Sequence, residues 1–212
     1  MPRITTATPK PYIAPLYLTQ DFGIGDEQES FDREENQLAG SRPMTRYSIT
    51  VGKFSVADFF DNNRYSHDPR TQFMGWAIMY NGAWDYAADT RGYTWGWVHE
   101  FHTRRWSLRY GSAAMPKTAN GLRFDRRLFR DRSDIFESEV RIRPRGHDGA
   151  VRLLSYINHA NAGTYADAIS LAERTGTTPD VTATRRVSTL KYGFGLSADQ
   201  EIVEGVGIFG RL

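Results

Sequence analysis

Long stretches of the 212-residue chain alternate apolar and polar side chains with a period of two residues. Successive side chains of a β-strand point to opposite sides of a sheet, so this pattern predicts strands with two unlike faces. We expect about eight strands, which cover residues 12–24, 46–52, 93–101, 105–111, 136–143, 151–158, 190–199 and 206–212. One short helix is expected at 165–174, where Ala168, Ile169 and Ala172 share a face.

Two kinds of all-β protein show this alternation. A soluble sheet buries its apolar face and exposes its charges, whereas a transmembrane barrel turns its apolar face to lipid and its polar face to a wet lumen. The expected strands are nearer to the ~9–11 residues of a tilted membrane strand than to the ~5–6 of a soluble one. Aromatic residues also gather near the strand ends, as at Phe22, Trp106 and Tyr192. We therefore expect an antiparallel meander from a transmembrane outer-membrane β-barrel.

The composition excludes several classes of function. The chain has no cysteine, so thiol catalysis, disulfide scaffolds and cysteine-ligated zinc are excluded. Lysine and arginine total 27 against 25 acidic residues, and this near-balance argues against a nucleic-acid partner. No apolar run approaches the ~20 residues of a membrane-spanning helix.

Enzymatic functions have weak support in the sequence. The segment 99–102 (HEFH) lacks the i, i+4 histidine pair of a helical zinc site. The acidic residues Glu34 and Glu35, or Glu137 and Glu139, could form the carboxylate pair of a glycosidase, but acidic residues are common in loops and on wet faces. No nucleophile elbow and no phosphate-binding loop occurs. We predict that the chain is not an enzyme and has no cofactor.

Several sequence motifs carry a specific resemblance. The segment 51–96 contains VGKF at 51–54, DFFDNN at 58–63, HDPRTQFM at 67–74 and GAWDYAADTRGYTWG at 82–96. Further motifs are PDVTATRR at 179–186 and KYGFG at 191–195. Together they resemble the carbohydrate-selective porin (OprB) family of Gram-negative outer membranes, and the resemblance runs from about residue 11 to residue 212.

The resemblance implies a pore for passive diffusion of carbohydrates, with sugars as permeating solutes and outer-membrane lipid around it. It leaves a homotrimer open for the full-length form. It also implies a longer chain, with a signal peptide that is missing here. A sugar-conducting lumen needs about 16–18 strands, so we expect residues 1–212 to form one partial porin barrel domain. The alternatives are a soluble β-rich carbohydrate-binding domain or glycosidase, and a small closed eight-stranded barrel.

The segment 58–91 is too long for a turn, and by analogy with general porins we expect it to fold into the lumen and narrow it. Sugars present hydroxyl groups and apolar C–H faces, so a weak site for them needs charged and amide groups beside aromatic rings. The expected pore-lining residues are Asn62, Arg64, Arg70, Trp84, Asp85, Asp89 and Arg91 from this segment, and Arg109, Glu139 and Arg141 from the strands.

A structural role is the alternative for some of these residues. Asp68 with Arg70, and Asp89 with Arg91, could form internal salt bridges that hold the segment against the wall. We expect Trp76, within an apolar run, to be a packed anchor rather than a ring that faces the solute.

Overall fold

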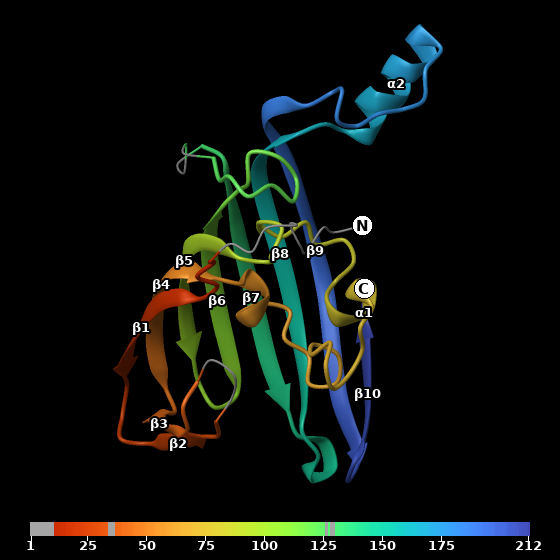
Figure 1. Ribbon diagram of the computed structural model, residues 1–212. Helices are drawn as coiled ribbons and strands as arrows, with labels where there is room; N and C mark the ends of the chain where they lie inside the picture. The colour runs from red at the N-terminus through yellow and green to blue at the C-terminus, as the bar shows by residue number, and fades with distance from the viewer. Residues whose placement is uncertain (1–10, 34–36, 126, 128–129) are drawn as a thin grey trace.

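The computed structural model describes residues 11–33, 37–125, 127 and 130–212, and it is dominated by one antiparallel sheet (Figure 1). The sheet has the order β1-β4-β5-β6-β7-β8-β9-β10. Its strands are β1 (Leu16–Gly23), β4 (Arg46–Phe54), β5 (Thr94–His102), β6 (Trp106–Ala114), β7 (Arg132–Ile142), β8 (Gly149–Ala162), β9 (Arg186–Val203) and β10 (Val206–Arg211). Each expected strand is present, and each pairs with its neighbour along the chain, so the predicted meander is confirmed.

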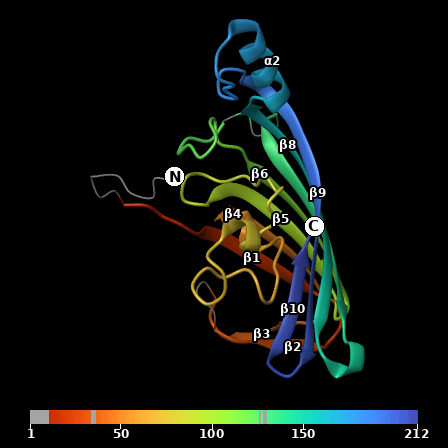
Figure 2. The same ribbon diagram turned by 90° about the vertical axis from the view of Figure 1, so that its right-hand side faces the viewer.

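The sheet is open. Among the described residues β1 pairs only with β4, and β10 only with β9, so the first and last strands are the two edges. This arrangement excludes the small closed barrel for the described part of the chain. Figure 2 shows the sheet as a curved wall, with the segment between β4 and β5 on its concave side. We refer to the concave side as the inner face and to the convex side as the outer face.

The two ends of the sheet differ in the length of their connections. Residues 103–105, 143–148 and 204–205 make short connections at one end, and η2 (Pro144–Gly146) lies in the second of these. The longer connection 24–45, between β1 and β4, is the exception at this end. Residues 55–93, 115–131 and 163–185 make long connections at the other end. This asymmetry is typical of outer-membrane barrels, which have short turns on one side and long loops on the other. We call these the short-turn end and the long-loop end.

The helix α2 (Tyr165–Thr175) projects from the long-loop end (Figure 1). Thr164 caps its first turn by accepting a hydrogen bond from the backbone N–H of Asp167. The helix stops at Gly176, whose φ of 67° is a left-handed conformation that glycine adopts without strain. Of the three residues that the sequence places on one face, Ala168 and Ala172 are buried, whereas Ile169 is exposed.

The connection between β1 and β4 contains a hairpin that the sequence did not reveal. The segment 25–42 is polar and acidic, which is typical of a solvent loop, but β2 (Gln28–Phe31) pairs with β3 (Gly40–Pro43). Arg42 links the two strands, because its guanidinium lies 2.7 Å from the Glu29 carboxylate and 5.0 Å from the centre of the Phe31 ring. A cross-strand ion pair and a cation–π contact therefore hold a segment that has little apolar surface.

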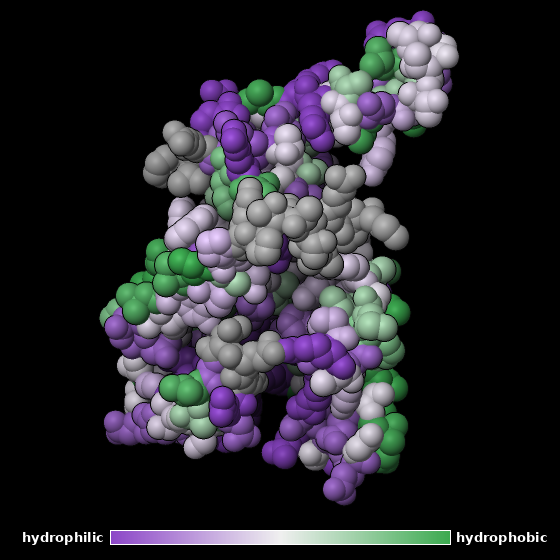
Figure 3. Space-filling model, in the orientation of Figure 1, coloured by the Kyte–Doolittle hydropathy of each residue, from purple (hydrophilic) through white to green (hydrophobic). Residues whose placement is uncertain are grey.

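The outer face of the sheet is apolar and exposed. On β9, Tyr192 and Phe194 are each 75% exposed, whereas Ser197 and Asp199 on the inner face are buried. Figure 3 shows hydrophobic residues along the flanks of the molecule. The other exposed apolar side chains of this face include Leu18, Val51, Trp95, Leu108, Phe136, Val140, Val151, Leu153, Ile157 and Ile208. None of the helices in the described part of the chain is long and apolar enough to cross a membrane.

The segment 55–93 packs on the inner face and contains η1 (Val56–Asp58) and α1 (Trp76–Met79). Its Phe60 and Trp84 pack against strand residues that include Ile135. A Cβ atom at Gly111 would lie 2.8 Å from the Phe60 ring, so this close approach requires glycine. The buried apolar cluster is Phe54, Val56, Phe60, Trp84, Ala87, Val98, Ala113, Met115, Ile135, Leu154, Tyr156 and Ala160. The inner face thus holds a small dry core beneath the segment, beside the charged region described next.

Candidate pore-lining site

Charged side chains of alternating sign cross the inner face from strand to strand. The strand register places Glu100 of β5 opposite Arg109 of β6, and Arg109 opposite Glu137 of β7. One row nearer to the short-turn end, Glu139 of β7 lies opposite Arg152 of β8. Opposite charges that face each other across an antiparallel pair attract one another, so the alternation of sign from strand to strand builds a ladder of ion pairs.

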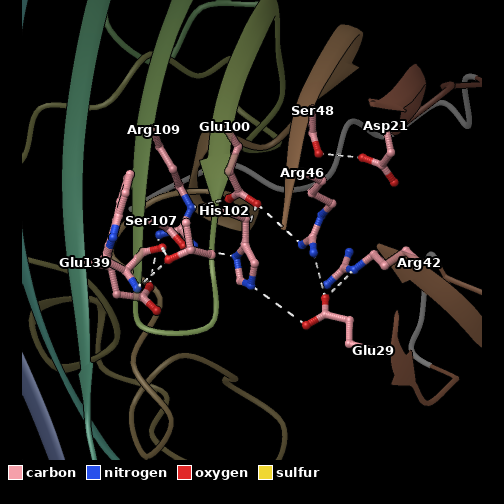
Figure 4. A network of polar contacts seen from close by, with 12 residues as sticks. Asp21, Glu29, Arg42, Arg46, Ser48, Glu100, His102, Ser107, Arg109 and Glu139 are labelled. Carbon is pink, nitrogen blue, oxygen red and sulfur yellow. Dashed lines mark hydrogen bonds and ion pairs between the residues drawn. The ribbon is translucent and has the colours of Figure 1, made fainter. Parts of the chain in front are cut away.

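The distances show that this ladder is continuous over six strands. Figure 4 shows the part that runs from Glu29 to Glu139. Arg109 lies 2.5 Å from Glu100, 2.8 Å from Glu137 and 3.0 Å from Glu139. Glu139 also lies 2.5 Å from Arg141 and 3.2 Å from Arg152. The ladder continues through Arg46, which lies 3.6 Å from Glu100 and 2.8 Å from Glu29, and through Asp199, which lies 2.5 Å from Arg152. Fixed guanidinium and carboxylate groups therefore line the inner wall.

Glu137 is the most enclosed carboxylate of the ladder. Its side chain has no exposed surface, and Arg109 is the one cation that pairs with it among the described residues. Its second oxygen accepts a hydrogen bond of 2.6 Å from the backbone N–H of Asp61. A charge removed from water in this way is stable only while its partners stay in place. Glu137 therefore joins the ladder to the segment 55–93.

Further contacts fix the segment 55–93 to the later strands. Arg211 of β10 lies 3.1 Å from Asp61 and also donates hydrogen bonds to Ser66. Asn63 donates a hydrogen bond of 3.1 Å to Ser197 of β9. From β8, the Tyr156 hydroxyl donates to the carbonyl of Ala83, and the Asn158 amide donates to the carbonyl of Asp85. Together with Glu137 of β7, these contacts anchor the segment to four strands, β7, β8, β9 and β10, so it is a fixed part of the inner wall.

A pocket of about 920 Å³ lies between this segment and the charged ladder at the short-turn end. Seven arginines and three carboxylates line it, so positive charge is in excess. The lining residues that carry charge are Arg64, Arg104, Arg105, Arg109, Glu139, Arg141, Arg143, Asp148, Arg152 and Asp199. A small polar solute in this pocket is surrounded by groups that donate hydrogen bonds from guanidinium and accept them at carboxylate.

The structure brings half of the expected pore-lining residues together at this pocket. They are Asn62 and Arg64 from the segment 55–93, and Arg109, Glu139 and Arg141 from the strands. Both residues from the segment are exposed. Arg141 is additionally held by Ser107, whose hydroxyl accepts hydrogen bonds of 3.0 Å from it.

The other expected residues lie elsewhere in the segment 55–93. Arg70 pairs with Asp68 at 2.8 Å, which is the internal salt bridge considered from the sequence. Asp85 pairs with Lys191 of β9 at 2.8 Å. These two pairs are partly or largely exposed and are separate from the residues that line the pocket.

Asp89 and Arg91 surround Tyr12. Asp89 is buried and accepts a hydrogen bond of 2.6 Å from the Tyr12 hydroxyl. It also accepts from the backbone N–H groups of Arg91 and Tyr93, so it orders the turn before β5. The Arg91 guanidinium lies 4.1 Å from the centre of the Tyr12 ring, and the Lys53 ammonium lies 3.7 Å from it. Asp89 and Arg91, considered from the sequence as an alternative salt bridge, instead take part in this hydrogen-bonded turn and the contact with Tyr12.

The two tryptophans of the segment have the opposite exposure from that expected. Trp84 was expected to face the solute, but it is 5% exposed and packs against Phe60 and Tyr86. Trp76 was expected to be a packed anchor, but it is 58% exposed. The reason is that α1 has four residues and buries only Met79 of its apolar run. Trp76 therefore offers a ring face to solvent, and Trp84 does not.

Several residues of the ladder were not selected from the sequence. They are Glu29, Arg46, Glu100, Glu137, Arg152, Asp199 and, at the anchor, Arg211. The available signal was the odd or even position of each residue along its strand, because the charged residues of the main sheet alternate with apolar residues that point outward. This parity places a charge on the inner face, but the register between strands decides which charges meet.

The carboxylates considered for glycosidase chemistry are engaged in this ladder or lie outside the described residues. Glu137 and Glu139 both lie within 3.0 Å of Arg109. Glu34 and Glu35 fall in the part of the chain that the structure does not describe. The described residues contain no group of three or more histidine and acidic side chains placed to hold a metal ion.

Comparison with known sequences identifies one family. The sequence model of the carbohydrate-selective porin, OprB family, matches residues 13–212. No curated protein and no solved structure matches the chain.

Proposed function

The chain belongs to the carbohydrate-selective porin, OprB family, and we propose that its sheet forms part of the wall of a pore through which sugars diffuse passively. The two-faced sheet is the observation that carries the proposal. Its apolar side chains are exposed on the outer face, while its charges are paired on the inner face. A wall of this kind meets lipid on one side and a water column on the other.

The charged ladder suits uncharged, hydroxyl-rich solutes. Guanidinium and carboxylate groups that lie side by side offer donors and acceptors to the hydroxyl groups of a sugar, which replace the hydrogen bonds that the sugar makes with water. Within the ladder, Glu100, Glu137 and Glu139 pair with Arg109, and the other ladder arginines pair with these carboxylates in turn, so the charges of the ladder are paired with one another. Binding therefore stays weak, and a solute that enters the pore can leave it.

The segment 55–93 sets the width of the passage in this proposal. It lies on the inner face and is anchored to β7, β8, β9 and β10, so it narrows the lumen permanently rather than as a moving gate. The pocket of about 920 Å³ beside it is large enough for a sugar, since ligand pockets span roughly 300–1,000 Å³. The outer face then contacts the lipid of the outer membrane.

Swelling of proteoliposomes tests the proposal. Vesicles that contain the closed pore whose wall includes this sheet should swell in isotonic D-glucose faster than protein-free vesicles, and the rate should fall with the size of the sugar. Passive diffusion predicts that the initial rate rises in proportion to the glucose gradient without a coupled ion. A protein that is folded in the vesicles and gives no swelling above the protein-free control would contradict the proposal.

A further inference from the structure

Another pocket lies away from the inner face, between α2 and the loop that follows it. Its volume is about 240 Å³. One wall is a face of α2, because Asp167, Ser170, Leu171 and Arg174 recur at the spacing of three and four residues that keeps side chains on one side of a helix. The other wall is formed by residues 183–186, which lead into β9. We call this pocket the helix groove.

The loop that forms the second wall is held against the start of the helix. A Cβ atom at Gly163 would overlap the carbonyl oxygen of Val181, so the loop passes this point at very close range. Asp180 accepts hydrogen bonds of 2.8 and 2.7 Å from the backbone N–H and the hydroxyl of Thr182, and the Thr184 hydroxyl donates to the carbonyl of Val181. The backbone walls of the helix groove are therefore fixed before any ligand arrives, which lowers the entropic cost of binding.

Three arginines and one carboxylate carry the charge of the helix groove. Arg186 lies 3.2 Å from Asp167, and both side chains are partly or largely exposed. Arg174 and Arg185 also line the groove and form no ion pair with another described residue. Asp180 of the loop is not among the lining residues. The groove thus holds two positive charges that its own carboxylate does not compensate.

Size and charge together indicate the kind of group that fits the helix groove. Sites that enclose a whole ligand have about 300–1,000 Å³, so this groove is suited to one small group of a larger molecule. A phosphate monoester carries a charge of about −1.5 to −2 at pH 7, which matches the two uncompensated arginines. Guanidinium groups bind phosphate oxygens through paired hydrogen bonds, and the Ser170 hydroxyl in the groove adds a donor.

The helix groove lies where the exposed apolar side chains of β9 end. Arg186 is the first residue of β9, and Val187 and Leu190, which follow it, are exposed. The helix α2 projects beyond the long-loop end of the sheet (Figure 1). A strand crosses the hydrocarbon of a membrane with about 9–11 residues, so the first residues of the 18-residue β9 extend past it to the level of lipid headgroups. Headgroup phosphates are therefore one source of the group that the arginines fit.

We propose that the helix groove binds a doubly charged phosphate group, supplied by a lipid headgroup or by a soluble phosphorylated molecule. Arg174 and Arg185 hold its oxygens, and Arg186 joins them by exchanging Asp167 for the phosphate. An exposed ion pair is weak, so this exchange is easily made. The phosphate site lies outside the pore wall and stands without the proposed function; only the lipid source depends on the sheet being in a membrane.

Protection from phenylglyoxal, which modifies arginine side chains, tests the proposal residue by residue. The folded protein in neutral detergent micelles is modified with and without the probe, and mass spectrometry measures the modification of Arg186. This readout does not count anions that bind at the arginine-lined pocket of the inner face. Inorganic phosphate should protect Arg186, whereas Arg145, an exposed arginine in η2, should not be protected.

Variants on both sides of the charge balance should move the half-protecting phosphate concentration in opposite directions. The double variant Arg174→Gln/Arg185→Gln should raise it by about tenfold or more, because charge-assisted hydrogen bonds are lost. Asp167→Asn should lower it by about threefold or more, because the competing carboxylate is removed. Arg145→Gln is the matched control and should leave it unchanged. Heat-modifiable gel mobility shows that each variant is folded.

Two lipid probes distinguish the sources of the phosphate. Mixed micelles with phosphatidic acid present a phosphate monoester, and phosphatidylglycerol, a diester with a single charge, is the matched control. Protection by phosphatidic acid without protection by inorganic phosphate assigns the groove to lipid, and protection by both adds soluble phosphates. The proposal is overturned if neither probe protects Arg186, if Arg145 is protected equally, or if the double variant binds phosphate as the wild type does. None of these outcomes bears on sugar conduction, which the swelling assay tests separately.

Discussion

Replacing Phe194 with arginine tests whether the outer face of β9 lies in lipid. Phe194 lies in the middle of the 18-residue strand Arg186–Val203 and is 75% exposed. On a soluble protein, a substitution at so exposed a position changes the free energy of unfolding by at most about 0.5 kcal/mol. At the midplane of a bilayer the same change costs about 2–4 kcal/mol, because the guanidinium leaves water for hydrocarbon. The two environments therefore give clearly different results.

Depth along the strand supplies an internal control. A membrane strand needs only about 9–11 residues to cross the hydrocarbon, so both ends of the 18-residue β9 extend beyond it. Val187→Arg and Ile202→Arg, at exposed positions near the two ends, should each cost only about 0–1 kcal/mol. The expected profile has its maximum at Phe194 and falls on both sides. Phe194→Leu controls for the loss of the aromatic ring.

The measurement is urea unfolding of the protein in lipid vesicles, followed by tryptophan fluorescence. The free energy in the absence of urea comes from linear extrapolation, and the slope shows whether the variants unfold to the same extent. Equal costs at the three arginine positions, within about 0.5 kcal/mol, would refute the reasoning. The outer face would then lie in water or against protein, and the two-faced sheet would no longer indicate a pore wall.

Two further predictions concern the inner face and its segment. Arg109→Met should lower the free energy of unfolding by about 3–5 kcal/mol, because Glu137 stays buried without a cation, whereas Arg143→Met at an exposed pair should cost less than about 1 kcal/mol; urea titration compares them. Gly111→Ala should cost about 1–3 kcal/mol, because the new Cβ meets Phe60, and Gly210→Ala, which meets nothing within 4 Å, should be nearly neutral in the same assay.

The strands of the main sheet could be predicted because each alternates over enough residues to define a period. β7 and β9, for example, expose Phe136 and Phe194 and bury Glu137 and Ser197. The hairpin of β2 and β3 escaped prediction because its strands have four residues each and are stabilised by Arg42 rather than by an apolar face. Short polar strands carry too little periodicity to be distinguished from a loop.

The contacts of the candidate site could be predicted only in part. Parity correctly places Arg109 and Glu139 on the inner face, but which carboxylates Arg109 meets depends on the register of three strands. The exposure of Trp76 and Trp84 depends on how the segment 55–93 packs, and no local pattern encodes it. Asp61 and Arg211 are 150 positions apart in the chain, so their pairing becomes evident only in the folded structure.

That long-range pairing has a consequence for the order of assembly. Arg211 of β10 binds Asp61 and Ser66 of the segment 55–93, which comes much earlier in the chain. The segment therefore lacks one of its anchors until β10 has joined the sheet. The segment is therefore fixed completely only late in folding, whatever order the residues emerge in during synthesis. Until β10 pairs with β9, Asp61 lacks its arginine partner, and the segment is held by β7, β8 and β9 alone.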